Sequence, residues 1–225
     1  MGEKGIPLTE SKEAKKIERR RPPRFELIAG NVCLDFVNTL DDRHIKPKEL
    51  LETYVDLVRF GEDSGLLQSQ QVERLFKRSY TDPERAQQAL VWGKELREAI
   101  HDVFWAIMNQ QPVPPAALAR LNADVQGAAA HMRLVPARGA TKGGFEWEFS
   151  DLNEFDSVLW PIARAAGDLL VSDQLPYVRA CFSKSCEWFF LDTSKNHHRR
   201  WCDMTSCGNR AKVQRFYARQ KKGRC

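Results

Sequence analysis

Four cysteines near the C-terminus constrain the fold of this 225-residue chain more than any other feature. They form two pairs with the spacing C-x4-C, Cys181 with Cys186 and Cys202 with Cys207, and fifteen residues separate the pairs. A tetrahedral zinc site needs two ligand pairs that bend around the ion, and intervals of two to four residues permit that bend. The spacing therefore predicts Zn2+ bound by these four thiolates, with a short hairpin between the pairs. The alternative is four thiols that share no ligand.

Other parts of the sequence indicate whether these thiols are expected in a reducing or an oxidising compartment. The N-terminal stretch MGEKGIPLTESKEAKK lacks the apolar core of a signal peptide. No apolar run approaches the roughly 18 residues of a membrane span. The expected compartment is a reducing cytoplasm, where clustered cysteines bind metals or do redox chemistry more often than they form disulfides. His197 and His198 are alternative zinc ligands, while Cys33 is expected to be a small core residue.

The charge is distributed unevenly along the chain. Residues 25–178 carry 15 Lys and Arg against 23 Asp and Glu, a net charge of −8, whereas residues 179–225 carry 12 against 3, a net charge of +9. Residues 1–24 carry 8 against 4, a net charge of +4. An acidic body with basic ends is typical of a chain that contacts a polyanion at one end. The alternative is a basic tail that only improves solubility.

Hydrophobic periodicity predicts a mainly α-helical body with one small β-hairpin, an α+β domain over residues 25–175. A basic, disordered arm is expected over 1–24, and a zinc-finger module built from a β-hairpin and a helix over 178–225. Within the body, helices are expected at 31–42, 49–63, 69–78, 83–111, 115–130 and 153–171. The hairpin is expected to pair 131–135 with 145–149, where Phe145, Trp147 and Phe149 alternate with glutamates as in a half-buried strand.

The C-terminal segment CFSKSCEWFFLDTSKNHHRRWCDMTSCGNRAKVQRFYAR resembles the CGNR zinc finger, which takes its name from the motif at residues 207–210. The match includes FLDTS at 190–194 and RRWC at 199–202, although Glu187 stands where a small residue such as Gly is expected. The stretch GNVCLDFVNTL at 30–40 resembles the opening of the ABATE domain. This domain accompanies the finger in proteins described as stress-induced transcription regulators. The resemblance implies a DNA-binding regulator.

The basic residues of the finger are the candidates for contacting double-stranded DNA. A helix is expected from Ser206, as its cap, to Lys222, with one basic stripe and a separate apolar stripe of Val213, Phe216 and Tyr217 that packs on the zinc-held hairpin. The basic stripe suits phosphates or the major groove. The candidate DNA-binding residues are Arg199, Arg200, Asn209, Arg210, Lys212, Arg215 and Arg219. The aromatic residues Trp188, Phe189, Phe190 and Trp201 stack on bases or, as we favour, include the core of the module.

The acidic body carries a candidate effector site. Asp35, Asn38, Thr39 and Asp42 form one face of the first predicted helix. We interpret Asp35 and Asn38 as ligand-binding residues of a pocket for a cationic or hydrogen-bonding small molecule. The alternative is a solvent-exposed face with a helix cap. The body is accordingly expected to sense an effector or to form a homodimer.

The sequence contains no P-loop, GxGxxG, HExxH or GxSxG motif. Four protein ligands would also leave the zinc no open position for an activated water. An enzyme is therefore not expected. The sequence favours a cytoplasmic DNA-binding transcriptional regulator without a membrane partner. The alternative is a zinc finger that docks an acidic protein of the transcription machinery, and RNA is a third partner that the sequence leaves open.

Overall fold

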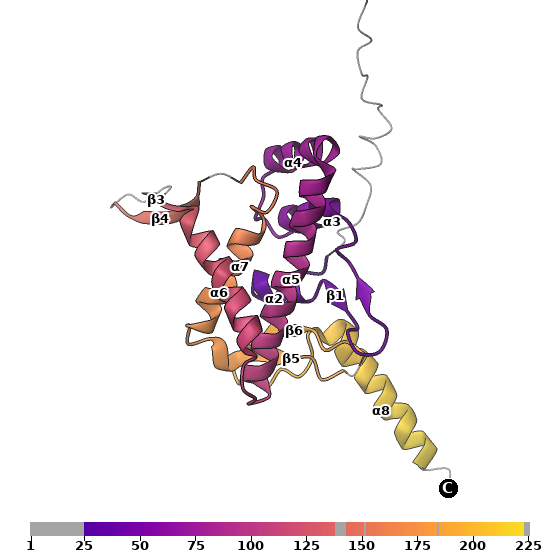
Figure 1. The fold of residues 1–225 in the computed structure, drawn as a ribbon. Coiled ribbons are helices and arrows are strands. Elements are labelled where there is room, and N and C mark those ends of the chain that lie inside the picture. The colour runs from indigo at the N-terminus through magenta and orange to yellow at the C-terminus, as the bar shows by residue number, and fades with distance from the viewer. Residues whose placement is uncertain (1–24, 138–142, 151, 184, 223–225) are drawn as a thin grey trace, which may run out of the picture.

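The computed structural model describes residues 25–222 except 138–142, 151 and 184, and it omits the side chains of residues 218, 219, 221 and 222 (Figure 1). The basic arm predicted over residues 1–24 lies outside the described part. The predicted fold class is confirmed: a mainly helical body carries small antiparallel hairpins, and four cysteines cluster in the C-terminal finger. None of the described helices is both long enough and apolar enough to cross a membrane.

The body is a set of helices packed around one long central helix. The central helix is α5 (Pro83–Met108), and α2, α3, α4, α6 and α7 all pack against it. These helices are α2 (Val32–Val37), α3 (Tyr54–Asp63), α4 (Ser69–Thr81), α6 (Pro115–Ala130) and α7 (Leu159–Leu170). As predicted, α5 begins with an Asp-Pro pair: Asp82 accepts the Arg85 N–H at 3.2 Å, and Pro83 occupies the first helical turn.

The first predicted helix is shorter than the sequence pattern indicates. Helix α2 ends at Val37, and Leu40–Asp41 (β1) turns back to pair with Lys48–Glu49 (β2). The helical pattern ends at Thr39: its hydroxyl donates to the Phe36 carbonyl at 2.7 Å, and its own carbonyl accepts the Leu50 N–H, which comes from outside the helix. Glu49 consequently lies in β2, so α3 starts later than predicted, after a capping box formed by Thr53 and Asp56.

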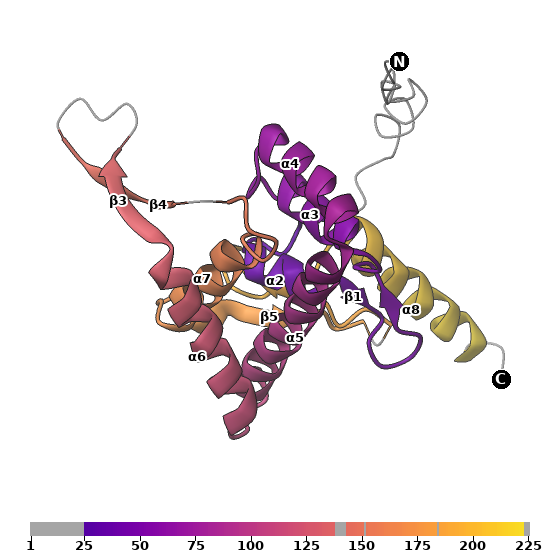
Figure 2. The same ribbon diagram turned by 45° about the horizontal axis from the view of Figure 1, so that its top comes forward.

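The predicted hairpin forms but is more exposed than expected. Strand β3 (Met132–Pro136) pairs with β4 (Phe145–Phe149), and Leu134 faces Trp147. Both views show this hairpin extending away from the helices (Figure 2). Phe145 is 74% exposed and Trp147 is 58% exposed. The prediction of a half-buried strand is therefore wrong for the outer part of β4, because no described element covers its apolar face.

The finger is joined to the body by a shared core. Its hairpin consists of β5 (Val178–Ala180) and β6 (Phe189–Leu191). A short 3-10 turn, η1 (Leu175–Tyr177), precedes β5. Strand β6 packs against α2, and β5 packs against α5. Phe189 and Phe190 are fully buried, which confirms that they are core residues. The chain then forms a π-helical turn, η2 (Met204–Gly208), followed by α8 (Asn209–Lys222), which extends away from the body (Figure 1).

Candidate metal centre and nucleic-acid interface

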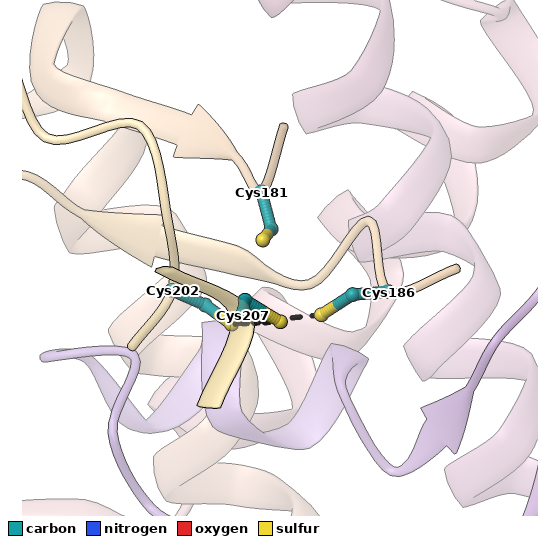
Figure 3. A group of neighbouring side chains, drawn as sticks. All are labelled: Cys181, Cys186, Cys202 and Cys207. Atoms are coloured by element: carbon teal, nitrogen blue, oxygen red, sulfur yellow. Dashed lines mark hydrogen bonds between the residues drawn. The ribbon is translucent and has the colours of Figure 1, made fainter. Parts of the chain in front are cut away.

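The four paired cysteines converge on one point. Cys181 follows β5, Cys186 lies in the turn before β6, and Cys202 and Cys207 lie before and within η2. Their side chains point toward one another (Figure 3), and all four sulfur atoms lie within 4.8 Å of one another. The Cys181 N–H donates to the Trp188 carbonyl at 2.8 Å, which closes the loop of the first cysteine pair. The Phe182 N–H donates to the Arg200 carbonyl at 2.9 Å, which joins that loop to the segment before Cys202.

The geometry of this cluster fits zinc. The Sγ atoms of Cys186 and Cys202 are 3.5 Å apart, and those of Cys202 and Cys207 are 3.7 Å apart. A tetrahedron with Zn–S bonds of about 2.3 Å has sulfur atoms about 3.8 Å apart. Four sulfur donors with no oxygen donor match the ligand set of a structural zinc site, which is closed to substrate.

Four thiol groups within 4.8 Å of one another cannot all ionise without a cation among them, because like charges repel. Hydrogen bonds from the thiols of Cys186 and Cys202 lower the pKa of Cys181 to about 2. The contact with Cys181, together with burial, raises the pKa of Cys186 and of Cys202. One thiolate thus suppresses the ionisation of its neighbours. A divalent metal ion removes this conflict, because a thiol that coordinates it is deprotonated outright. Zn2+ is the cofactor of this finger.

The histidines considered as alternative ligands lie outside the cluster of cysteines. The Nδ1 atom of His197 lies 2.9 Å from the Asp192 carbonyl oxygen, and its ring stacks on Tyr177 with centroids 3.8 Å apart. His198 is exposed. His197 therefore shapes the loop between the two cysteine pairs.

Asp192 is a buried structural residue that sequence reasoning missed. Its carboxylate accepts the Ser194 N–H at 3.0 Å, the Ser194 hydroxyl at 2.6 Å and the Arg199 N–H at 2.8 Å. These bonds fix the loop that returns the chain to the second cysteine pair. The available signal was the FLDTS run at 190–194, in which an acidic residue directly follows two apolar ones.

Glu187, which departs from the pattern of the family, lies where the backbone favours glycine. Its φ is +54°, in the left-handed region. The side chain reaches the β1–β2 loop, where a carboxylate oxygen lies 3.0 Å from His44 Nε2. Glu187 in place of a small residue thus adds a contact between the finger and the body at a position where the backbone conformation favours glycine.

Arg199 was predicted to bind DNA, but its guanidinium is used within the finger. It donates to the Trp201 carbonyl at 2.9 Å and to the Cys202 carbonyl, and it lies over the Phe190 ring at 4.6 Å. Its role in binding DNA stays a prediction. Arg199 braces the zinc-binding loop.

Three other predicted DNA-binding residues, Arg200, Arg210 and Arg215, meet at one groove. It has a volume of about 560 Å3 and lies between the cysteine loops and the first turns of α8. Phe182, Ser185 and Trp201 also line it. Within the described part of the chain, none of the three arginines forms an ion pair, although Arg210 donates to the Ser185 hydroxyl at 3.0 Å. We call this site the arginine groove.

The structure does not place the other predicted DNA-binding residues of α8 in the arginine groove. Lys212 is exposed but does not line the groove. Asn209 donates to the Thr205 carbonyl at 3.0 Å and so supports the turn before α8. That turn is capped by Asp203, which accepts the Ser206 N–H at 2.7 Å, and not by Ser206 as predicted. The side chain of Arg219 lies outside the described part.

The apolar stripe of α8 does not pack on the finger. Val213 is 53% exposed, Phe216 57% and Tyr217 60%. The prediction that these residues cover the zinc-held hairpin is wrong. The hairpin instead packs on α2 and α5, which leaves the outer part of α8 without a covering element in the described structure.

The structure places Asp35 and Asn38 at the joint between the body and the finger. Asn38 is buried, and its amide makes two hydrogen bonds to the backbone of Phe189: its Nδ2 donates to the carbonyl at 2.9 Å, and its Oδ1 accepts the N–H at 2.8 Å. Asp35 accepts the Ala29 N–H at 2.9 Å. The Ala29 carbonyl in turn accepts the Leu191 N–H at 2.7 Å. These partners give both residues a structural role, and the ligand pocket predicted from their shared helix face stays a prediction.

Comparison with known families agrees with this architecture. Residues 30–173 match the ABATE family, described as "Putative stress-induced transcription regulator", and residues 177–220 match the CGNR zinc finger. A comparison with curated proteins gives no match. The ABATE match alone covers more than half of the chain. The chain therefore belongs to the ABATE family and carries a CGNR zinc finger after the ABATE domain.

Proposed function

We propose that this protein is a cytoplasmic, DNA-binding transcriptional regulator. Cys181, Cys186, Cys202 and Cys207 hold Zn2+, and the ordered finger presents the arginine groove to double-stranded DNA. In this proposal the zinc has a structural task, which is to fix the two cysteine loops and the start of α8. The ABATE domain positions the finger, and it senses an effector or forms the homodimer.

The observation that carries the proposal is the convergence of three arginines at the groove. Arg200, Arg210 and Arg215 come from two separate segments, and no carboxylate of the described chain neutralises them. Gathering like charges opposes folding unless a polyanion balances them. A phosphate backbone supplies that charge, and the planar guanidinium suits phosphate and the edge of guanine. The acidic body, with its net charge of −8, would keep the DNA at the finger end.

The experiment is a binding titration of the zinc-loaded, full-length chain with duplexes of specific and random sequence at several salt concentrations. Arg210→Ala and Arg215→Ala are compared with Arg85→Ala, an exposed arginine at the start of α5. Loss of a phosphate contact should weaken binding to all sequences and reduce the salt slope by about one. Loss of a base contact should cost about 1–3 kcal/mol at a single base pair. Zinc content is measured in parallel, and binding by both groove variants as by wild type would contradict the proposal.

One observation favours a second candidate function, the docking of an acidic protein of the transcription machinery. The exposed stripe of Val213, Phe216 and Tyr217 lies on a strongly basic helix, and such a helix can bind an acidic, apolar groove. The same titration separates the two functions. A protein-docking finger should bind random duplex DNA weakly even at low salt, whereas DNA binding should decline steeply with salt.

A further inference from the structure

The arginine groove contains an exposed aromatic ring paired with a guanidinium. Contacts to a DNA duplex do not require such a pair. Phe182 directly follows the first cysteine and is 65% exposed. The Arg200 guanidinium lies 4.2 Å from the centre of the Phe182 ring, and Trp201 meets the same ring edge to face at 5.9 Å. The hydrogen bond from the Phe182 N–H to the Arg200 carbonyl holds the pair in register.

Other residues that line the groove supply charge and hydrogen-bond donors. Arg210 and Arg215 project from the first turns of α8, and Ser183 and Ser185 lie on the loop between the first two cysteines. The groove volume of about 560 Å3 falls within the range of small-molecule sites. The groove therefore offers both a flat surface for stacking and cationic groups for an anion.

We propose that the arginine groove binds one unstacked nucleotide, with its base against the Phe182–Arg200 pair and its phosphate at Arg210 and Arg215. Unpaired bases stack on aromatic rings and on guanidinium planes, and guanidinium groups recognise phosphate. A perfect duplex cannot use this arrangement, because its bases are stacked and expose only their edges in the grooves. The nucleotide has two sources, a free mononucleotide or an unpaired position in a nucleic-acid strand. This inference rests on the proposed function, since it uses the same arginines.

The test compares three probes on the full-length, zinc-loaded protein: a perfect duplex, the same duplex with a single-nucleotide bulge, and free AMP. We expect tighter binding to the bulged duplex than to the perfect one, or saturable binding of AMP followed by tryptophan fluorescence. A preference for the bulge without AMP binding identifies the strand-borne source, and AMP binding identifies the free nucleotide. The inference is overturned if the protein neither prefers the bulged duplex nor binds AMP.

Variants of the stacking residue sharpen this test. Phe182→Ala should lose about 5- to 150-fold in affinity for the bulged duplex or for AMP, as expected for one base stack. Phe182→Tyr should restore it, and Phe182→Ala should lose more affinity for the bulged duplex than for the perfect one. The matched control is Phe145→Ala, which truncates an exposed phenylalanine on β4, remote from the finger. Zinc content is checked in each variant.

The outcomes separate this inference from the proposed function. In one outcome, the perfect duplex binds with a steep salt dependence, the bulge does not raise the affinity, AMP does not bind, and Phe182→Ala binds as wild type does. The proposal of a nucleotide site is then wrong, and the DNA-binding proposal stands. If no duplex binds but AMP binds and is lost in Phe182→Ala, the groove is a nucleotide site on a protein that does not bind DNA. Wild-type binding of every probe by Phe182→Ala excludes the stacking role.

Discussion

At the scale of single residues, Glu187 shows how the backbone limits what a side chain can contribute. Its left-handed φ costs a non-glycine residue about 1–2 kcal/mol, whereas an exposed pair such as that with His44 contributes about 0–1 kcal/mol. Glu187→Gly should therefore raise the free energy of unfolding by up to about 1 kcal/mol, while Glu187→Val should lower it because a β-branched residue resists this conformation. Urea denaturation measures both. A Gly variant less stable than the Val variant would contradict this account.

Asp35 gives a prediction about pH. Burial raises the pKa of Asp35 to about 6, although hydrogen bonds from the backbone of Ala29 and Ile28 oppose the rise. Between about pH 4 and pH 6 the folded chain keeps a proton that the unfolded chain loses, so this carboxyl makes the fold less stable as the pH rises. Asp35→Asn still accepts the Ala29 N–H. We therefore expect the variant to be more stable than wild type by about 1–2 kcal/mol at pH 7.5, a value reduced for partial exposure, and similar to wild type at pH 4.

Thermal unfolding across this pH range measures the effect, and the exposed Asp173→Asn is the matched control. If the difference between Asp35→Asn and wild type were constant with pH, the carboxyl would titrate normally. A small molecule held by Asp35 would give another result, since the substitution would then remove the response to that ligand without a change in stability.

At the scale of elements, sequence patterns predicted the zinc pairs and α5, α6 and the β3–β4 pairing, because local spacing and proline positions define them. They could not predict where α2 ends. The apolar repeat continues to Leu40, but the two hydrogen bonds of Asn38 are made to Phe189, which is 151 residues away in the sequence. Periodicity also cannot distinguish an apolar stripe that packs on its own chain from one that is exposed, as on α8.

The joint between α2 and β6 therefore carries its own prediction. Asn38→Ala leaves a buried N–H and a buried carbonyl of Phe189 without their partners, so we expect a loss of about 2–4 kcal/mol in the free energy of unfolding. Asn109→Ala removes an exposed hydrogen bond at the end of α5 and should cost under about 1 kcal/mol. Chemical denaturation compares the two variants. Equal, small losses would mean that the bonds of Asn38 contribute little and would reopen its role as a ligand-binding residue.

At the scale of the whole molecule, the finger and the body are parts of one core. The rings of His101 and Trp105 of α5 and of the finger residue Phe189 lie nearly parallel, with the His101 centroid 5.9 Å from Trp105 and 5.2 Å from Phe189 and those of Trp105 and Phe189 6.3 Å apart. Burial lowers the pKa of His101. Trp188 Nε1 donates to Asp41 of β1 at 2.8 Å. The sequence indicated a separate zinc-binding module. The spacing of the cysteines predicts the metal site, but it carries no information about which surface the hairpin packs against.

This shared core changes what loss of the metal should do. A free-standing zinc finger unfolds alone when its metal is removed, since metal binding supplies its folding energy. Here Phe189 and Phe190 are buried against the body, so release of the cysteine loops would also loosen the surface that covers α2 and α5. Cys186→Ser should abolish zinc binding and lower the melting temperature of the whole chain by about 2–4 °C for each kcal/mol lost. Hydrogen exchange should accelerate at α2 as well as at η2.

The matched control is Cys33→Ser, a buried cysteine of α2 that is not part of the zinc cluster. It should reduce stability while the chain keeps its full zinc content, so that the two effects can be told apart. Two separate melting transitions in Cys186→Ser, with the exchange of α2 unchanged, would show that the body folds independently of the finger. A single transition at lower temperature would show that the zinc stabilises the ABATE domain through β6, which would make the position of the finger depend on the state of the body.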